Sequence, residues 1–419
     1  MKSITDKPMR VAMLSIHSDP LGKLGTQDTG GMSIYIRELS RELGRAGHHV
    51  DIFTRSSGER QCDTLQIADN VRVIYLNHFR SRHIPKSMLY SYITELWTSL
   101  EIYRLRNSLL YDLVHSHYWV SGKIGTFAQK RWNVPHFLTL HTTGIIKKIS
   151  CFQEMESINR LISEKRLANE CDCILAPTYR EKNYFIKYLQ VPDDSIRLVP
   201  CGVNLDRFNP IDQEKARKVL GLPAERRLVL YVGRFAPVKG INRLLYAMGH
   251  LREEPNIGLI MVGGDGNDSV NSRAIQRMAH RMGIRDSIML RGQVDHDELP
   301  LYYSAANMLV LPSYYESFGL VALESLACGT PVVSFNVGAM DNIIQSDLTG
   351  AIVHDPGPRT LAQAIRAVIL KPVKSAFYRE AIRQSVSQYG WRNSALRLIK
   401  EYERAVCEGT ECRQQALVS

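Results

Sequence analysis

Short apolar segments alternate with longer amphipathic segments along almost the whole chain. In the first half, the apolar segments predict strands at 10–17, 49–55, 71–77, 112–118, 136–141, 172–177 and 196–200. A second series is predicted at 228–233, 258–263, 288–291, 308–311, 331–335 and 350–353. The intervening segments have the periodicity of helices. Alternating strands and helices predict parallel sheets with helices packed on them, an α/β fold class.

The two strand series are separated by the segment CGVNLDRFNP, whose turn residues predict a linker near 202–210. We expect two facing Rossmann-like domains, at 1–203 and 204–388. A helical pattern continues from Trp391 to about Cys407, with a frayed end, and we expect the segment 389–419 to cross back onto the N-terminal domain. Doubly wound sheets bind ligands beyond the carboxyl ends of their strands, so the site is expected in the cleft between the domains.

Two glycines mark the first strand-to-helix loop. Gly30 and Gly31 stand directly before a helical segment, where backbone N–H groups have no partner within the helix. A tight turn is the alternative reason for such a pair. The loop lacks the GxGxxG spacing of dinucleotide-binding folds, which argues against a dehydrogenase.

Two cations follow the first strand of the second series. Arg234 and Lys239 flank a turn that contains Pro237 and precedes a helix. Two such charges at the mouth of a cleft can hold a pyrophosphate and stabilise the charge that develops as it leaves. The alternative is a pair of solvated surface cations.

Two carboxylates follow the strand at 308–311. Glu316 lies in the loop and Glu324 on the next helix, a little over two helical turns further on, so both can face one direction. One can accept both hydroxyls of a ribose, and the other can reach a sugar. The alternatives are an acid/base pair of the glycoside hydrolase type and two solvated acids. Gly319 and Leu320 open the helix and offer N–H groups to a phosphate.

Histidines end two neighbouring strand candidates. His117 and His141 are followed by Tyr118 and Thr142, which suits a polar sugar pocket, whereas His115 could equally be a structural residue. These positions lie at the carboxyl ends of their strands, where the cleft is expected.

The segment VDHDE contains an Asp-x-Asp pair, which is the metal signature of one class of glycosyltransferases. Asp295 is followed three residues later by Glu298, a spacing typical of a helix capping box, so we interpret Asp295 as a cap. No bound metal is predicted.

Composition adds limits on location and partners. The chain has no apolar run long enough to span a membrane and no secretory N-terminus, so a cytoplasmic location is expected. Eight scattered cysteines predict no disulfide framework. The net charge of +11 comes without a nucleic-acid-binding signature, which favours phosphate-bearing small molecules and leaves open a weak attraction to a membrane surface. A homodimer is also left open.

Five segments together resemble a known family. They are DTGGM, HSHYW, TLHTT, VGRFAPVKG and, most specifically, ESFGLVALESLACGTPVV at 316–333. They are similar to the retaining glycosyltransferases of family four, which have the GT-B fold. Within that family, the first half resembles the inositol-phosphate N-acetylglucosaminyltransferases of mycothiol synthesis and, less closely, the sucrose-phosphate synthases.

The resemblance implies a donor site in the C-terminal domain. Arg234 and Lys239 would bind the donor pyrophosphate, Glu324 the ribose, and the segment 292–294 the base. The full set of implied donor residues is Gly233, Arg234, Lys239, Gly292, Val294, Glu316, Phe318, Gly319, Leu320 and Glu324.

The resemblance also implies an acceptor site in the N-terminal domain. It would be formed by Gly31, Tyr118, Thr142 and Arg160, the last three near an acceptor phosphate. His141 would lie against the transferred sugar. The implied catalytic residues are His141, Arg234, Lys239 and Glu316. The alternative for Arg160 is a helical ion pair with an acid such as Glu156 or Glu164.

The implied reaction moves glucose or N-acetylglucosamine from a nucleoside diphosphate, UDP being favoured, to a hydroxyl of a polar, phosphorylated sugar or polyol. It would need neither a cofactor nor a metal. The rival hypothesis is a non-catalytic, sugar-nucleotide-binding regulatory protein on the same scaffold. Three departures stand out: Ser33 replaces Asn, NVGAMDNI replaces a Gly-Gly and Glu pattern, and the acceptor-phosphate lysine has no clear counterpart, although Arg80, Arg82 and Lys86 lie in its region.

Overall fold

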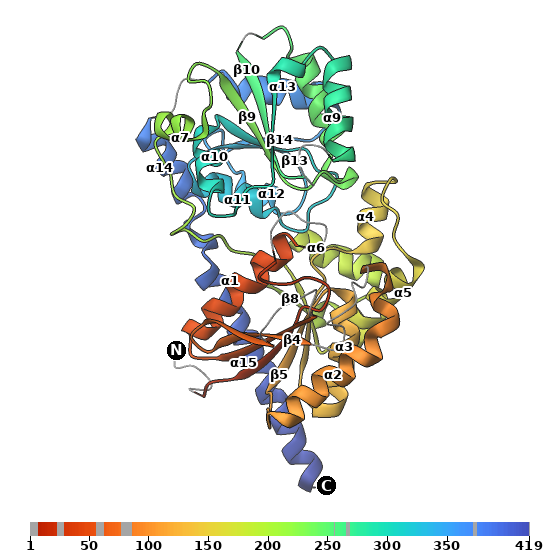
Figure 1. Ribbon diagram of the computed structural model, residues 1–419. Helices are drawn as coiled ribbons and strands as arrows, with labels where there is room; N and C mark the ends of the chain where they lie inside the picture. Colours follow the sequence, from red (N-terminus) through yellow and green to blue (C-terminus); the bar gives the residue numbers. More distant parts are fainter. Residues whose placement is uncertain are drawn as a thin grey trace.

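The computed structural model describes residues 7–22, 29–55, 63–76, 86–254, 256–264, 269–371 and 375–418. Two α/β domains lie one above the other, and the long C-terminal helix runs from between them down along the first domain (Figure 1). Each domain is built on one sheet. Within the described ranges, no helix combines the length and the apolar character needed to cross a bilayer.

The first sheet has eight strands in the order β3-β4-β2-β1-β5-β6-β7-β8. All neighbours are parallel except β3 and β4, which are antiparallel. The strands are β1 (Arg10–Leu14), β2 (His49–Arg55), β3 (Thr64–Ala68), β4 (Val71–Leu76), β5 (Leu113–His117), β6 (His136–Thr139), β7 (Cys173–Ala176) and β8 (Ile196–Leu198).

The second sheet has six parallel strands in the order β11-β10-β9-β12-β13-β14. They are β9 (Arg227–Val232), β10 (Ile257–Val262), β11 (Ile288–Gly292), β12 (Met308–Leu311), β13 (Val332–Phe335) and β14 (Gly350–Val353). The central strands are buried on both faces, as their continuous apolar sequences predict.

Helices cover both faces of each sheet. In the first domain they are α1 (Gly31–Arg45), α2 (Ile93–Arg106), α3 (Tyr118–Trp132), α4 (Gly144–Ser150), α5 (Ile158–Glu170) and α6 (Tyr179–Tyr184). The second domain contributes α7 (Gln213–Leu220), α8 (Ile241–His250), α9 (Val270–Arg281), α10 (Leu299–Ala305), α11 (Leu320–Ala327), α12 (Met340–Ile343), α13 (Pro358–Ile369) and α14 (Ala376–Gln384). The last helix is α15 (Trp391–Val418).

The α/β prediction and its two strand series are confirmed, since every predicted strand is present with ends shifted by a few residues. Strand β3 was not predicted. It is an edge strand paired only with β4, and Leu65 and Gln66 are exposed, so it has no apolar run to reveal it. The prediction of a frayed end after Cys407 was wrong, because α15 continues to Val418.

The strand order of each sheet contains one switch point, and both switch points lie next to the inter-domain cleft. In the first sheet, β1 lies between β2 and β5, and in the second, β9 lies between β10 and β12. Loops leave β1 and β5, or β9 and β12, in opposite directions, which opens a crevice at the carboxyl ends of the strands. The glycine pair, the two cations and Glu316 all lie in these loops.

The chain passes between the domains twice, and the two passages touch. Val203 and Gly390 form a parallel bridge, and the N–H of Val203 donates to the carbonyl of Tyr389 at 2.8 Å. A Cβ on Gly202 would lie 2.7 Å from Trp391, so this approach requires glycine. Beyond it, α15 packs against α1, and Tyr402 hydrogen-bonds to Nδ1 of His115 at 2.6 Å. His115 is therefore a structural residue.

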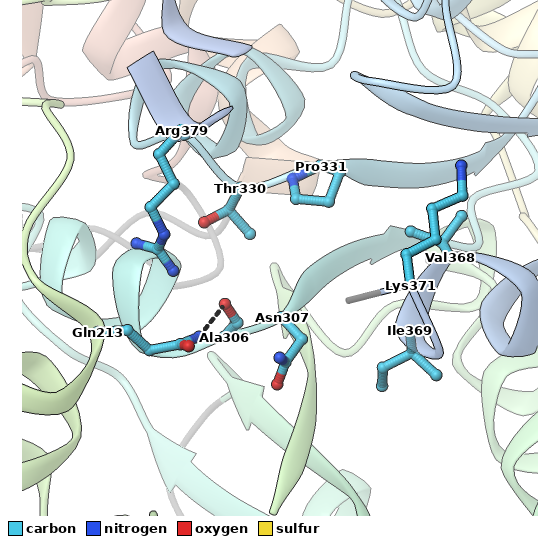
Figure 2. A pocket seen from close by; sticks show the side chains of 10 residues that line it. Gln213, Ala306, Asn307, Thr330, Pro331, Val368, Ile369, Lys371 and Arg379 are labelled. Carbon is cyan, nitrogen blue, oxygen red and sulfur yellow. Dashed lines mark hydrogen bonds between the residues drawn. The ribbon is translucent and has the colours of Figure 1, made fainter. Parts of the chain in front are cut away.

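A small hollow in the second domain lies away from the cleft (Figure 2). Asn307 and Pro331 in its lining directly precede β12 and β13, so it opens at the amino ends of these strands. Its polar groups are largely engaged: Gln213 donates to the carbonyl of Ala306 at 3.0 Å, and Arg379 donates to Ser304 at 2.8 Å. Ligands of such a sheet bind at the opposite, carboxyl edge.

Candidate active site

The N-termini of α1 and α11 meet across the cleft. A Cβ built on Gly31 would lie 3.5 Å from Cδ1 of Leu320, so the two helix starts are in contact distance. Neither start is capped by a side chain, and Gly319 has a left-handed φ of +105° that favours glycine. Free N–H groups and helix dipoles from both domains therefore point toward one region, which favours an anion.

Lys239 and Glu316 are brought together by a close approach of two loops. Lys239 Nζ donates to Glu316 Oε1 at 2.7 Å, and the hydroxyl of Ser313 donates to the same oxygen at 2.7 Å. Gly240, at φ +68°, would place a Cβ 2.0 Å from the carbonyl oxygen of Pro312, so any side chain there would separate the loops. Glu316 thus holds Lys239 at the cleft. The family resemblance implied that both residues belong to the donor site.

Arg234 extends from the same loop into solvent. Its side chain is exposed, and among the described residues no carboxylate lies within ion-pair distance of it. The backbone beneath is tightly packed: a Cβ on Gly263 would lie 2.0 Å from the carbonyl oxygen of Gly233, and the N–H of Gly263 donates to Gly292 at 2.7 Å. Gly233 and Gly292, two of the predicted donor residues, therefore lie in closely packed backbone that has no side chains.

Glu324 is buried and fixed by two donors. His296 Nε2 donates to its Oε1 at 2.9 Å, and the Tyr303 hydroxyl donates to Oε2 at 2.7 Å. Each carboxylate oxygen keeps a second lone pair for a ribose hydroxyl. His296 was not predicted as a site residue. Val294, two residues earlier, packs against the core.

The capping interpretation of Asp295 is wrong. Helix α10 begins at Leu299 with Pro300 in its first turn, and its N-cap, Glu298, makes no side-chain cap. Proline fits the first turn of a helix because it lacks an N–H, so the helix starts later than the sequence spacing suggested. Asp297 pairs with Arg207 at 2.8 Å. Among the described residues, no three potential His, Cys, Asp or Glu ligands gather at one point.

The histidines at the ends of β5 and β6 contact each other. Nδ1 of His117 lies 2.9 Å from Nε2 of His141. Burial lowers the pKa of His141 to about 3 and that of His117 well below its ordinary value, so both rings are neutral. His141 and Tyr118 have left-handed φ values of +59° and +72°. Such strain in residues other than glycine is typical of functional sites.

The structure brings the three predicted acceptor-phosphate residues together. Arg160 donates to the carbonyl and the hydroxyl of Thr142 at 2.8 and 3.1 Å, and its guanidinium lies 4.8 Å from the centre of the Tyr118 ring. Arg160 also pairs with Glu164 at 2.6 Å and with Glu156 at 2.8 Å. The alternative from the sequence, helical ion pairing, is therefore also present. Burial opposes the charge of Arg160, but Glu164, Tyr118 and Glu156 outweigh it and raise its pKa.

The three departures from the family pattern have different outcomes. Ser33 is fully buried and hydrogen-bonds to the hydroxyl of Ser18 and the carbonyl of Asp19, so it supports the first loop. Gly338, at φ +57°, would place a Cβ 2.4 Å from the carbonyl oxygen of Phe318, so NVGAMDNI retains a glycine where it packs against the backbone of Phe318. Arg80, Arg82 and the side chain of Lys86 lie outside the described residues.

Contacts that close the cleft were not predicted from the sequence. The N–H of Val238 donates to Glu154 at 3.1 Å, and Arg180 pairs with Asp341 at 3.0 Å. The N–H of Thr143 approaches the hydroxyl of Tyr315 at 3.4 Å, directly beside Glu316. These pairs join residues far apart in sequence, and no local pattern indicates them.

Glu181 lies buried next to Tyr315, and burial raises the pKa of its carboxyl to about 8. The folded protein then binds a proton that the unfolded chain releases between about pH 4.5 and 8, so stability is lost as the pH rises. Between pH 5 and 7 we expect the free energy of unfolding to fall by about 2–3 kcal/mol more in the wild type than in Glu181→Gln. Urea denaturation at both pH values measures this, and parallel pH profiles would contradict it.

Two family models match the chain: "Glycosyltransferase Family 4" over residues 29–207 and "Glycosyl transferases group 1" over residues 212–385. A D-inositol 3-phosphate glycosyltransferase of Xylanimonas cellulosilytica is 34% identical over 405 residues, covering 94% of this chain and 97% of that protein. A second one, of Catenulispora acidiphila, is 34% identical and covers 95% and 96%.

The solved structures include a similar protein as well. Sucrose-phosphate synthase from Thermosynechococcus elongatus matches with a TM-score of 0.85 and 32% identity, covering 98% of this chain and all of that one. The catalytic domain of starch synthase IV from Arabidopsis thaliana matches with a TM-score of 0.75 at 15% identity, which concerns the fold alone. The predicted GT-B fold and the family resemblance are thereby confirmed.

Proposed function

The chain belongs to glycosyltransferase family 4, and from this premise we propose that it transfers glucose or N-acetylglucosamine from a UDP-sugar to a hydroxyl of a phosphorylated sugar or polyol, with retention at the anomeric carbon. One observation carries the proposal. The cations Arg234 and Lys239 lie on one side of the cleft, and the cluster of Arg160, Thr142 and Tyr118 lies on the other.

The second domain supplies the donor site in this proposal. Arg234 and Lys239 would hold the diphosphate together with the free N–H groups of Gly319 and Leu320. Glu324, already oriented by His296 and Tyr303, would accept the ribose hydroxyls. Lys239 would then lie between Glu316 and the phosphate, so its charge would be shared with the leaving group. The two cations and the N–H groups are in place before the bond breaks, which is the condition for electrostatic catalysis.

The chemical step breaks the bond between the anomeric carbon and the diphosphate oxygen. The acceptor hydroxyl oxygen bonds to that carbon on the same face, and its proton passes to the departing phosphate oxygen. This route is supported by two groups at the cleft that are poorly suited to act as a base: His141 has a pKa of about 3, and Glu316 is paired with Lys239. His141 would line the sugar.

The first domain supplies the acceptor site. The names of the relatives, which contain inositol 3-phosphate, and the contact of Arg160 with Thr142 and Tyr118 support an acceptor phosphate here. Glu156 holds part of the guanidinium and also pairs with Lys147 at 2.7 Å. We propose that the phosphate takes the position of the Glu156 carboxylate and gains both cations.

A transfer assay with UDP-glucose and UDP-N-acetylglucosamine tests the function. We expect the wild type to prefer phosphorylated over dephosphorylated polyols by about 10–100-fold in kcat/KM, since a charge-assisted hydrogen-bond pair contributes about 1.5–3 kcal/mol. Thr142→Val should lose part of this preference, and Glu156→Gln, which removes the competing charge, should increase it. Equal use of both acceptors by the wild type would reject the phosphate site. Binding of the donor with no transfer to any acceptor would instead favour the regulatory hypothesis.

Catalysis is expected to survive removal of divalent metals. Arg234, Lys239 and the two helix N-termini supply the positive charge that a metal would contribute to the leaving diphosphate. Initial rates in excess EDTA should therefore stay within about twofold of those without it. A loss of activity that returns when Mg²⁺ or Mn²⁺ is added back would contradict this.

A further inference from the structure

Large apolar side chains are exposed along one outer edge of the first domain. Between α4 and α5, Phe152 is 89% exposed and Met155 is 93% exposed. Three further side chains extend this surface, which we call the apolar ridge: Ile149, Ile158 and Ile162. Five large apolar side chains are exposed between residues 149 and 162, which is more than expected for scattered surface residues. The ridge is therefore a candidate interaction surface.

The charges around the apolar ridge are sorted by sign. The acidic side chains of the segment point inward: Glu154 and Glu156 pair with Lys147, and Glu164 pairs with Arg160. The exposed charges beside the ridge are cations, Lys148 and Lys165. On α5, Ile158 and Ile162 are flanked by Lys165, an arrangement typical of helices that lie at a membrane interface.

A row of arginines lies on α9 of the second domain. Arg273, Arg277 and Arg281 are exposed and follow one another at helical spacing, and in the described part of the chain no carboxylate is within 4 Å of them. Like charges at this spacing destabilise a helix, so local stability does not explain the row. In Figure 1, α9 lies on the same edge of the molecule as α4 and α5.

We propose that this edge docks on an anionic membrane surface. Phe152 and Met155 would enter the interface, while Lys148, Lys165 and the α9 arginines would lie against lipid phosphates. A second copy of the chain is a poorer occupant, because a twofold contact would place the ridge of one copy against the same ridge, and like cations against each other. An anionic membrane has negative headgroups, which match the cations, and an apolar interior, which matches the apolar ridge.

Docking would hold the cleft near the bilayer. The segment that carries Phe152 and Met155 also carries Glu154 and Glu156. Glu154 accepts from the N–H of Val238, in the loop with Arg234 and Lys239, and Glu156 accepts from Arg160. Anchoring this segment therefore fixes the rim of the site. The inference is independent of the acceptor's identity, because binding to vesicles can be measured without turnover.

The test is co-sedimentation of the purified full chain with two kinds of vesicle, phosphatidylcholine alone and phosphatidylcholine mixed with phosphatidylglycerol. We expect at least about 10-fold stronger partitioning to the anionic vesicles, weakened by salt. Phe152→Ser with Met155→Ser should lower it about 10-fold or more. Replacing Arg273, Arg277 and Arg281 by glutamine should also lower it about 10-fold or more.

Phe377→Ser is the matched control, because Phe377 is 85% exposed on α14, outside the ridge. It should leave partitioning unchanged, and all variants should keep the wild-type melting temperature. Equal binding to both vesicle types, or equal loss in the control, would overturn the proposal. Dimerisation in solution that the double ridge variant abolishes, without vesicle binding by the wild type, would assign the ridge to contact between copies instead.

Discussion

Replacing Lys239 by alanine is expected to lower kcat by about 10²–10³-fold, because one preorganised charge contact to a developing anion contributes about 3–4 kcal/mol to transition-state stabilisation. The ammonium group is already positioned: it lies 2.7 Å from Glu316, in a loop whose approach to β12 depends on Gly240. Steady-state kinetics with saturating donor and acceptor measure the effect.

The control for Lys239 separates catalysis from folding. Lys371 is similarly exposed in the same domain and pairs with Asp347, but it lies at the amino edge of the sheet, so Lys371→Ala should keep normal turnover. Arg234→Ala offers a second variant with little effect on folding, because Arg234 is exposed and has no carboxylate partner among the described residues. Near-normal kcat in both Lys239→Ala and Arg234→Ala would remove these cations from the mechanism.

The sequence predicts the sheets well because their strands are parallel and buried. A strand such as β9 is apolar at nearly every position, since both faces are covered, and the helix that follows has a distinct period. Strand β3 has one neighbour and exposed residues, so its pairing depends on β4 rather than on its own composition. Edge strands of this kind are specified by tertiary context.

The candidate site was predictable where it follows strand ends and not where it depends on long-range packing. Tyr118 comes directly after β5, and Thr142 lies three residues beyond the end of β6. Because the two strands are neighbours, the convergence of these residues follows from topology. The partnership of His296 with Glu324 joins a turn to a helix, and the contact of Thr143 with Tyr315 joins two domains. Such pairs depend on how the sheets and domains pack, which no local spacing encodes.

Arg160 shows a further limit, because contacts that belong to two alternative interpretations occur together. Helical spacing predicted pairing with Glu156 or Glu164, and the family resemblance implied a phosphate site shared with Thr142 and Tyr118. Arg160 makes the ion pairs and contacts both residues, and the phosphate itself stays a prediction. The five N–H groups of a guanidinium allow both sets of contacts at once. Spacing alone cannot reveal that the ion pairs are buried, and burial decides how strongly stability depends on them.

Arg160→Ala is therefore expected to lower the free energy of unfolding by about 3–5 kcal/mol, the usual effect of removing one partner of a buried ion pair. Glu164 has no exposed surface, and without the guanidinium its charge would be matched only by the N–H of Gly144, which donates to it at 2.7 Å. Urea denaturation at pH 7 measures the loss. Because Arg160→Ala is expected to lose this stability, Thr142→Val is the better probe of the acceptor phosphate.

The double variant Arg160→Ala/Glu164→Gln distinguishes an unpaired charge from lost packing. The amide is neutral, so the double variant should recover about 2 kcal/mol or more of the loss in Arg160→Ala. The single variant should also regain more stability than the double variant as the pH falls toward 5, because burial without the guanidinium raises the pKa of Glu164 further and a protonated carboxyl carries no charge to compensate. A double variant no more stable than Arg160→Ala, with parallel pH profiles in the two, would assign the loss to the packing of the Arg160 side chain against Tyr118 rather than to its charge.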